Sequence, residues 1–225
     1  MDRFSPRAIA SALYPRYSDL MHRVNCNGML TEWVARYEPI QRFNHRFELY
    51  RHIQDHYVST KPIDYLEFGV YQGASIREWT QIHQNPESRF YGFDSFQGLP
   101  EDSATWGEKG RFNVNGVIPD VADPRCSFVA GWFHETVPSF LQTTVLNRQV
   151  VMNVDSDLYP SVLYPLTTLD SHLGQGAIII FDEFSIADHE FRAWIDYTSA
   201  YRRTYEVVGG AGKRGIEQMA VVLTN

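Results

Sequence analysis

The chain has 225 residues, of which 44% are hydrophobic and 21% charged, with 15 Gly and 11 Pro. This is the composition of an ordinary folded globule, and it excludes wholesale disorder, collagen and coiled coil. A formal net charge of −7 without a basic block makes a nucleic-acid partner unexpected. The longest apolar run, Ala177–Phe181, is far shorter than the roughly 20 residues of a membrane helix. No secretory signal is visible and the two cysteines lie far apart, so we expect a cytoplasmic protein without a membrane segment.

Residues 1–60 are expected to form a helical extension that acts as a lid. Aromatic residues recur at helical spacing in this segment: Phe43, Phe47, Tyr50 and Tyr57. Pro15, Pro39 and Asn44 supply breaks. Arg46 and Tyr50 fit two roles, a reach over a bound ligand or packing in the core, and the sequence does not choose between them. The same helices are a candidate surface for self-association into a homo-oligomer.

From residue 61 onward, short β-rich apolar runs alternate with amphipathic stretches, which is the pattern of βαβ units. The candidate strands are Ile63–Phe68, Phe90–Asp94, Cys126–Ala130, Gln149–Asp155 and Ala177–Asp182. Two sets of residues at helical spacing predict helices between the strands: Val162, Leu166, Leu169 and Leu173, and Phe191, Trp194, Ile195 and Thr198. Two final runs beginning at Tyr205 and Gln218 predict an antiparallel hairpin at the edge of the sheet. Residues 61–225 are therefore expected to form an α/β domain, a mainly parallel Rossmann-like sheet with helices on both faces.

Residues 97–125 form a long irregular region that is rich in Gly and Pro and contains Trp106. Loops of this length are usually lids or disordered segments. We expect this one to be a lid on the side where a substrate binds.

The first of these strands runs into a glycine turn, Leu66-Glu-Phe-Gly-Val-Tyr-Gln-Gly-Ala-Ser75, and the next strand ends at Asp94. This layout suits an adenosine ligand whose ribose hydroxyls pair with the carboxylate. Tyr71 stands where a dinucleotide site needs the glycine that lets the backbone approach a pyrophosphate. Glu67 at the turn would repel phosphate and attract an ammonium group. The turn therefore favours a phosphate-free adenosine compound with an ammonium group, such as S-adenosylmethionine.

Acidic residues follow two neighbouring strands, Asp155 and Asp157 after one, Asp182 and Glu183 after the next. The carboxyl ends of parallel strands meet at the edge where ligands bind. Carboxylates that converge there repel one another unless a cation is present, and a set of oxygen ligands selects a hard ion such as Mg²⁺. Solvated strand-end acids without an ion are the alternative.

Several of these segments occur in the order found in one enzyme family. They are Glu67–Gly73, Tyr91–Glu101, Gly131–Pro138, Val154–Tyr159 and Phe181–Phe184. In these segments, residues 45–225 resemble the macrocin-type O-methyltransferases, class I metal-dependent enzymes that act on sugar hydroxyls of antibiotics. The stretch Gly-Phe-Asp-Ser-Phe-Gln-Gly-Leu-Pro, which ends at Pro100, is the most specific element of the resemblance.

The resemblance implies a fold, a cofactor and a set of site residues. The fold is that of class I methyltransferases, and the cofactor is S-adenosylmethionine. The implied cofactor-binding residues are Glu67, Gly69, Val70, Tyr71, Gly73 and Ser75 at the turn, Asp94 and Ser95 at the ribose, and Gly131 and Trp132 near the adenine. The implied Mg²⁺ ligands are Asp155, Asp182 and Glu183. Ser156 and Glu183 depart from the family pattern, which generally has Gly and Asp at these two positions.

The expected reaction is methyl transfer to a hydroxyl of a sugar or a glycosylated natural product, a small-molecule substrate. Coordination to Mg²⁺ would lower the pKa of the hydroxyl, and a carboxylate would take its proton. Asp155 is the candidate base as well as a metal ligand. His189 is a second candidate proton acceptor, with helix capping as its alternative role.

Two other functions fit parts of the sequence. A strand followed by Asp155-Ser-Asp157 is also typical of a metal-dependent glycosyltransferase with an Asp-x-Asp motif, although the early glycine turn argues against it. A module that binds S-adenosylmethionine without catalysis is the second alternative.

Overall fold

In the computed structural model, which describes residues 6–213 and 215–225, an eight-stranded sheet in the order β1-β7-β8-β6-β5-β2-β3-β4 forms the centre of the molecule. The strands are β1 Arg42–Phe43, β2 Ile63–Phe68, β3 Arg89–Asp94, β4 Cys126–Ala130, β5 Gln149–Val154, β6 Ile178–Phe181, β7 Tyr205–Ala211 and β8 Gln218–Leu223. All pairs are parallel except those that β8 makes with β6 and β7. The predicted mainly parallel α/β fold is therefore confirmed.

The predicted strands match the observed ones to within one residue at each end. Asp155 and Asp182, expected as the last strand residues, lie immediately beyond β5 and β6. The C-terminal hairpin β7–β8 is present, but its expected place at the sheet edge was wrong. β8 lies between β6 and β7, and β1 pairs in parallel with β7 outside the hairpin. A two-residue strand shows no alternation of apolar and polar residues, so sequence periodicity could not reveal β1.

The helices are α1 Pro6–Tyr37, α2 Arg46–Ile53, α3 Ala74–Ile82, α4 Phe133–Thr143, α5 Tyr159–Thr168 and α6 Glu190–Tyr201, with a π-helical turn at Gln54–Val58 and a 3₁₀ turn at Asp170–His172. The predicted break at Pro15 was wrong, because α1 continues through this residue. A proline removes one hydrogen bond and bends a helix without having to end it. The predicted breaks at Pro39 and Asn44 coincide with the ends of α1 and β1.

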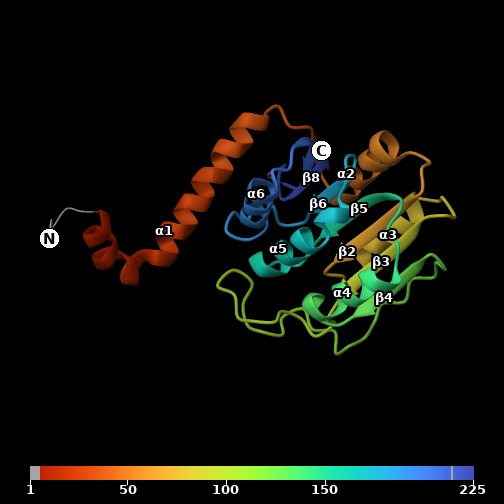
Figure 1. Ribbon diagram of the computed structural model, residues 1–225, viewed down its shortest axis with the longest axis horizontal. Coiled ribbons are helices and arrows are strands. Elements are labelled where there is room, and N and C mark those ends of the chain that lie inside the picture. Colours follow the sequence, from red (N-terminus) through yellow and green to blue (C-terminus); the bar gives the residue numbers. More distant parts are fainter. Residues whose placement is uncertain (1–5, 214) are drawn as a thin grey trace.

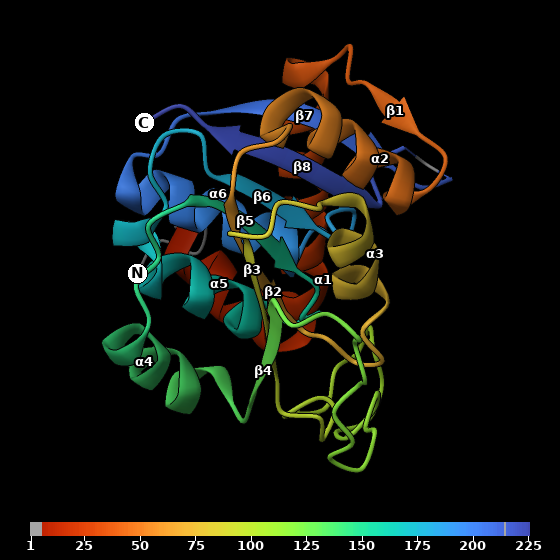
Figure 2. The ribbon, with the colours of Figure 1, turned by 90° about the vertical axis from the view of Figure 1, so that its right-hand side faces the viewer.

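Helices cover both faces of the sheet (Figure 2). Alternate residues of each strand point to opposite faces, so that Leu66 and Phe68 of β2 join the core on the side of α4, α5 and α6, whereas Tyr65 joins the core under α2 and α3. Trp33, in the C-terminal part of α1, packs against Phe184 and Phe191 on the first of these faces. Burial on both faces explains why β6 is a continuous apolar run and why β2 and β5 are mostly apolar.

The N-terminal part of α1 extends away from the sheet (Figure 1). It carries large apolar side chains that are exposed, among them Tyr14, Leu20, Met21 and Val24. In the part of the chain that the structure describes, no helix combines the length and the apolar character that crossing a bilayer requires.

The order of the sheet reverses between β2 and β5, because the chain proceeds from β2 outward to β3 and β4 on one side and from β5 to β6 on the other. In open α/β sheets, ligands bind beyond the carboxyl ends of the strands at such a switch point. The glycine turn follows β2, and the predicted acids follow β5 and β6. The topology therefore brings together the two motifs that the sequence singled out separately.

Candidate active site

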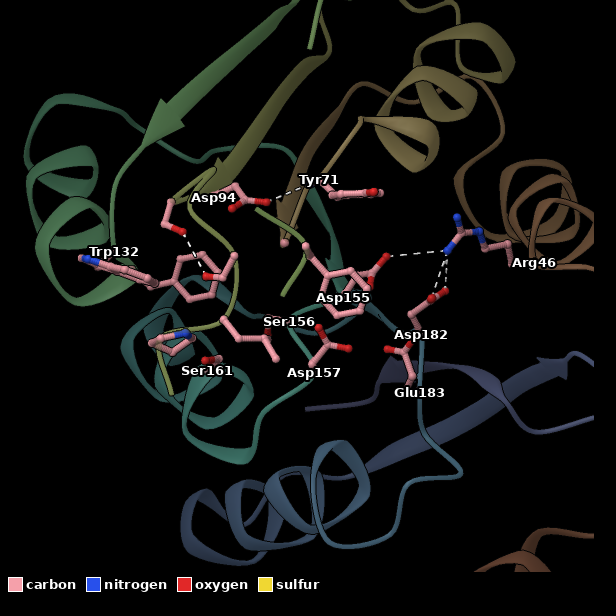
Figure 3. Close-up of a pocket in the computed structure, with 17 residues that line it drawn as sticks. Arg46, Tyr71, Asp94, Trp132, Asp155, Ser156, Asp157, Ser161, Asp182 and Glu183 are labelled. Carbon is pink, nitrogen blue, oxygen red and sulfur yellow. Dashed lines mark hydrogen bonds and ion pairs between the residues drawn. The ribbon is translucent and has the colours of Figure 1, made fainter. Parts of the chain in front are cut away.

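A cavity of about 260 Å³ opens at the carboxyl ends of β2, β3, β5 and β6 (Figure 3). Its lining includes Arg46 from α2, Gly69 and Tyr71 from the glycine turn, Asp94, Ser95, Gly98, Leu99, Pro100 and Phe112 from the segment after β3, Trp132 and Phe133 at the start of α4, Asp155, Ser156, Asp157 and Ser161 after β5, and Asp182 and Glu183 after β6. Acids and aromatic side chains thus line the same cavity.

The glycine turn after β2 is fixed by close packing and by Asp94. Gly69 has a φ of +90°, and a Cβ at this position would lie 1.7 Å from the carbonyl oxygen of Asp155, so only glycine fits. Tyr71 adopts the left-handed region with a φ of 52°. The Oδ2 atom of Asp94 accepts hydrogen bonds from the backbone N–H groups of Val70 and Tyr71, both at 2.8 Å. The carboxylate expected at the ribose therefore also holds the turn in place.

The structure brings about half of the expected cofactor residues to the cavity. Gly69, Tyr71, Asp94, Ser95 and Trp132 line it, whereas Glu67, Val70, Gly73, Ser75 and Gly131 do not. Two contacts account for part of this difference. Pro119 packs on Gly73, at 3.1 Å from where a Cβ would lie, and the Tyr50 hydroxyl donates to Ser75 Oγ at 3.3 Å. The segment 97–125 and α2 thus cover one side of the glycine turn.

Glu67 is a buried carboxyl beneath the turn. Its side chain points to the α2 and α3 face, where the hydroxyl of Tyr65 donates to it. Burial raises the pKa of Glu67 to about 8, although the Tyr65 hydrogen bond and the Arg46 charge act in the opposite direction. Burial thus favours the protonated form of this group, whereas attraction of an ammonium group would require its ionisation. Its role in cofactor binding stays a prediction.

Asp155, Asp182 and Glu183 form a cluster in which one oxygen from each side chain lies within 4.8 Å of the others. Backbone hydrogen bonds extend the sheet to two of these residues, because Asp155 N–H donates to Phe68 at 2.8 Å and Asp182 N–H to Val154 at 3.1 Å. We call these three residues the acid cluster.

The donor chemistry of the acid cluster fits a hard divalent cation. Three carboxylates supply the oxygen ligands that Mg²⁺ prefers. Two buried oxygens, Glu183 Oε2 and Ser156 Oγ, have no hydrogen-bond partner among the described residues. Unpaired buried polar atoms are unfavourable, and a bound ion with its water shell would satisfy them.

Burial and mutual repulsion raise the pKa values of several acids here. Burial, followed by the charge of Asp182, raises the pKa of Asp155. Burial and the neighbouring Glu190 raise the pKa of Glu183. Glu190 is itself fully buried, and its Oε2 atom accepts the N–H of Glu183 at 2.8 Å. Such a concentration of acids in a cavity is typical of a functional site.

Arg46 is the cation that faces these acids. Its Nη1 atom lies 3.0 Å from both carboxylate oxygens of Asp182 and 3.6 Å from Asp155 Oδ2. Burial lowers the pKa of the guanidinium, but the charges of Asp182, Tyr50 and Asp155 and the hydrogen bond to Asp182 together outweigh this effect, so the net pKa is raised. The sequence left two roles open for Arg46 and Tyr50, a reach over a ligand or packing in the core. Arg46 lines the cavity, whereas Tyr50 is buried in the core.

Asp157 also lines the cavity but lies outside the acid cluster. It adopts a left-handed backbone conformation with a φ of 63°. Burial and the charge of Asp182 raise the pKa of Asp157 to about 7, whereas Arg111 acts to lower it. Its position two residues after Asp155 was visible in the sequence, but the predicted roles of metal ligand and base went to Asp155.

His189 does not line this cavity. Its Nδ1 atom accepts the N–H of Tyr159 at 3.3 Å at the start of α5, and its side chain lines a neighbouring groove beside α1. Burial lowers the pKa of His189. This position fits the helix-capping alternative, and a role as proton acceptor stays a prediction without a contact to the acid cluster.

The sequence was compared with protein-family models and with curated proteins. The model of the macrocin-O-methyltransferase (TylF) family matches residues 40–208. The chain belongs to this family. Among curated proteins, a demethyldecarbamoylnovobiocin O-methyltransferase from Streptomyces niveus is 27% identical over 64% of this chain and 63% of its own length. A mycinamicin III 3''-O-methyltransferase from Micromonospora griseorubida is 26% identical over 58% of this chain and 61% of its own length. The matches thus span less than two thirds of these relatives.

Solved structures of other methyltransferases share the fold. The O-methyltransferase NovP is 22% identical, with a TM-score of 0.64 over 80% of each chain. The calicheamicin methyltransferase CalS11 is also 22% identical, with a TM-score of 0.61 over 78% of this chain and 76% of its own. These likenesses confirm the expected class I methyltransferase fold, and family membership leaves the glycosyltransferase alternative without support.

Proposed function

We propose that the protein is an S-adenosylmethionine-dependent O-methyltransferase that acts, with the help of Mg²⁺, on a hydroxyl of a sugar or a glycosylated natural product. One observation carries the proposal, because the glycine turn and the acid cluster open onto the same cavity. Membership of the macrocin-O-methyltransferase family and the named substrates of its relatives support the reaction class and the kind of substrate.

The cofactor would lie along the wall formed by the glycine turn and the end of β3. Asp94 faces the cavity there and can accept a ribose hydroxyl beside its backbone donors, since an ionised carboxylate offers about four lone-pair sites. Trp132 and Phe133 provide an apolar wall at the start of α4 for the adenine. The methyl group would then point toward the acid cluster.

Asp155, Asp182 and Glu183 would hold the Mg²⁺ ion. When bound, it would acidify and orient the substrate hydroxyl. Methyl transfer is an in-line displacement, so the hydroxyl oxygen must be held about 3 Å from the methyl carbon and opposite the sulfur. The protein's contribution is to fix this geometry and to exclude water, for which the aromatic side chains of the cavity wall are suited.

We assign the general base to Asp157 in preference to Asp155. Asp155 offers an oxygen to the acid cluster, and its Oδ2 atom lies 3.6 Å from Arg46 Nη1, so a metal ion and a guanidinium both compete for this carboxylate. Asp157 faces the same cavity from outside the cluster. In an Asp157→Asn variant, we expect binding of S-adenosylhomocysteine and of Mn²⁺ to be retained while turnover falls by roughly 10²–10⁴-fold. Asp155→Asn should lose Mn²⁺ binding in addition to turnover. If Asp157→Asn keeps its turnover, the general base is Asp155.

The reaction is tested by incubating the protein with methyl-labelled S-adenosylmethionine and a panel of glycosides, with and without a chelator. Labelled product that disappears with chelator and returns with Mg²⁺ is expected. Full activity in chelator would remove the cation from the proposal but leave the methyltransferase. Thermal shift distinguishes the alternatives, because a ligand at 100 times its Kd stabilises by about 2.7 kcal/mol. Stabilisation by S-adenosylhomocysteine without turnover on any glycoside would favour the non-catalytic module.

A further inference from the structure

The counter-ion of the acid cluster comes from a separate part of the chain. Among the described residues that line the cavity, Arg46 carries the one cationic side chain. It belongs to the first turn of α2, 136 positions before its partner Asp182. Figure 3 shows the guanidinium reaching from α2 toward Asp155 and Asp182.

Arg46 compensates only part of the cluster. A single nitrogen, Nη1, contacts both oxygens of Asp182 and approaches Asp155, which is a weaker arrangement than the two-nitrogen fork of the strongest arginine–carboxylate pairs. Glu183 keeps an unpaired buried oxygen. Arg46 therefore contacts two of the three acids, Asp182 and Asp155, and leaves Glu183 to find another partner.

A divalent cation bound by the acid cluster would need an oxygen of Asp182, and both oxygens of Asp182 are now held by Arg46. A guanidinium and a metal ion cannot both lie in contact with the same side of one carboxylate, because their charges repel at that distance. The two cations are therefore competitors for Asp182.

We propose that Arg46 is a displaceable counter-ion. It holds Asp182 and Asp155 together while no divalent cation is bound, and it leaves Asp182 when the cation enters. Because Arg46 is at the beginning of α2, the exchange removes an anchor of that helix and links cation binding to its mobility. The inference rests on the cation-binding part of the proposed function.

The test is a titration of the 225-residue chain with Mn²⁺, in which free Mn²⁺ is measured by electron paramagnetic resonance. Arg46→Gln should bind Mn²⁺ on the order of tenfold more tightly than the wild type, because no charge-assisted pair has to be broken. Arg51→Gln is the matched control. It removes the same charge from the same helix, but Arg51 pairs with Glu78 at 2.6 Å and is largely exposed. Its Mn²⁺ affinity should equal that of the wild type.

Amide hydrogen exchange, compared between the wild type and Arg46→Gln, gives a second readout. Saturating Mg²⁺ should accelerate amide exchange in residues 46–53, and Arg46→Gln should show no such acceleration. Three results would each overturn the proposed displacement of Arg46. They are equal or weaker Mn²⁺ binding by a folded Arg46→Gln, slower amide exchange of α2 with Mg²⁺, and no Mn²⁺ binding by any variant. Methyl transfer is measured separately. Methylation of a glycoside without displacement of Arg46 would refute only the present inference. Displacement of Arg46 without any methyl transfer would refute the proposed function.

Discussion

Replacement of Asp94 by Asn tests whether this carboxylate holds the glycine turn as well as a ligand. Its Oδ2 atom accepts two backbone N–H groups at 2.8 Å, and its Oδ1 atom accepts the N–H of Phe96 at 2.7 Å. An asparagine can keep its oxygen toward the first two donors only by turning its NH₂ group toward the third. Phe96 is 1% exposed, so its N–H would be left without water.

An unsatisfied buried N–H is unfavourable by roughly 1–3 kcal/mol, and we expect Asp94→Asn to lose about 2 kcal/mol of unfolding free energy in the absence of cofactor. For a chain of this length, this corresponds to a fall in Tm of about 4–8 °C. Scanning calorimetry without ligand measures the effect, and Asp120→Asn, an exposed acid on the following segment, is the control. An unchanged Tm with weaker binding of S-adenosylhomocysteine would show that Asp94 acts on the ligand alone.

Two further changes probe the framework of the site. Gly69→Ala should abolish cofactor binding and lower stability, because the added Cβ would overlap the Asp155 carbonyl oxygen at 1.7 Å; isothermal titration with S-adenosylhomocysteine checks it, and retained affinity would contradict the packing argument. His83 is 1% exposed, and burial, with the Arg125 charge, lowers its pKa from 6.5 to about 4. The unfolded state therefore binds a proton first as the pH falls, so the stabilisation is present above pH 6.5 and is lost toward pH 4. Between pH 7 and pH 5, urea unfolding should show the wild type losing about 2 kcal/mol relative to His83→Gln, and parallel losses in both proteins would refute this assignment.

The sheet was predictable because its central strands are buried on both faces. Because of this burial, these strands are mostly apolar, as in Ile178–Phe181, where the acid Asp182 follows directly after the last strand residue. The acids Asp155 and Asp182 could be placed at one edge for the same reason. Their convergence follows from parallel strand order, which the alternation of strands and helices indicates.

The remaining parts of the site depend on contacts that leave no periodic trace in the sequence. Arg46 reaches the acid cluster because β1 pairs with β7 and His45 caps α2, and a two-residue strand is invisible to pattern analysis. His189 is seven positions after Asp182, yet the chain turns it toward α5 and away from the cavity. Glu67 alternates with Phe68 in β2, so its side chain enters the opposite face. For these three residues, distance along the sequence did not indicate distance from the acid cluster in the structure.

The pairing of β1 with β7 also bears on how far the chain can be shortened. Arg42 and Phe43 cover the outer rim of the hairpin through Gly210 and Ala211, and the family match begins at residue 40, just before them. A protein trimmed to start at residue 61 would expose the open side of β7, a template for intermolecular strand addition. Such a truncated protein should precipitate on refolding, whereas trimming within the protruding part of α1 would leave this rim sealed.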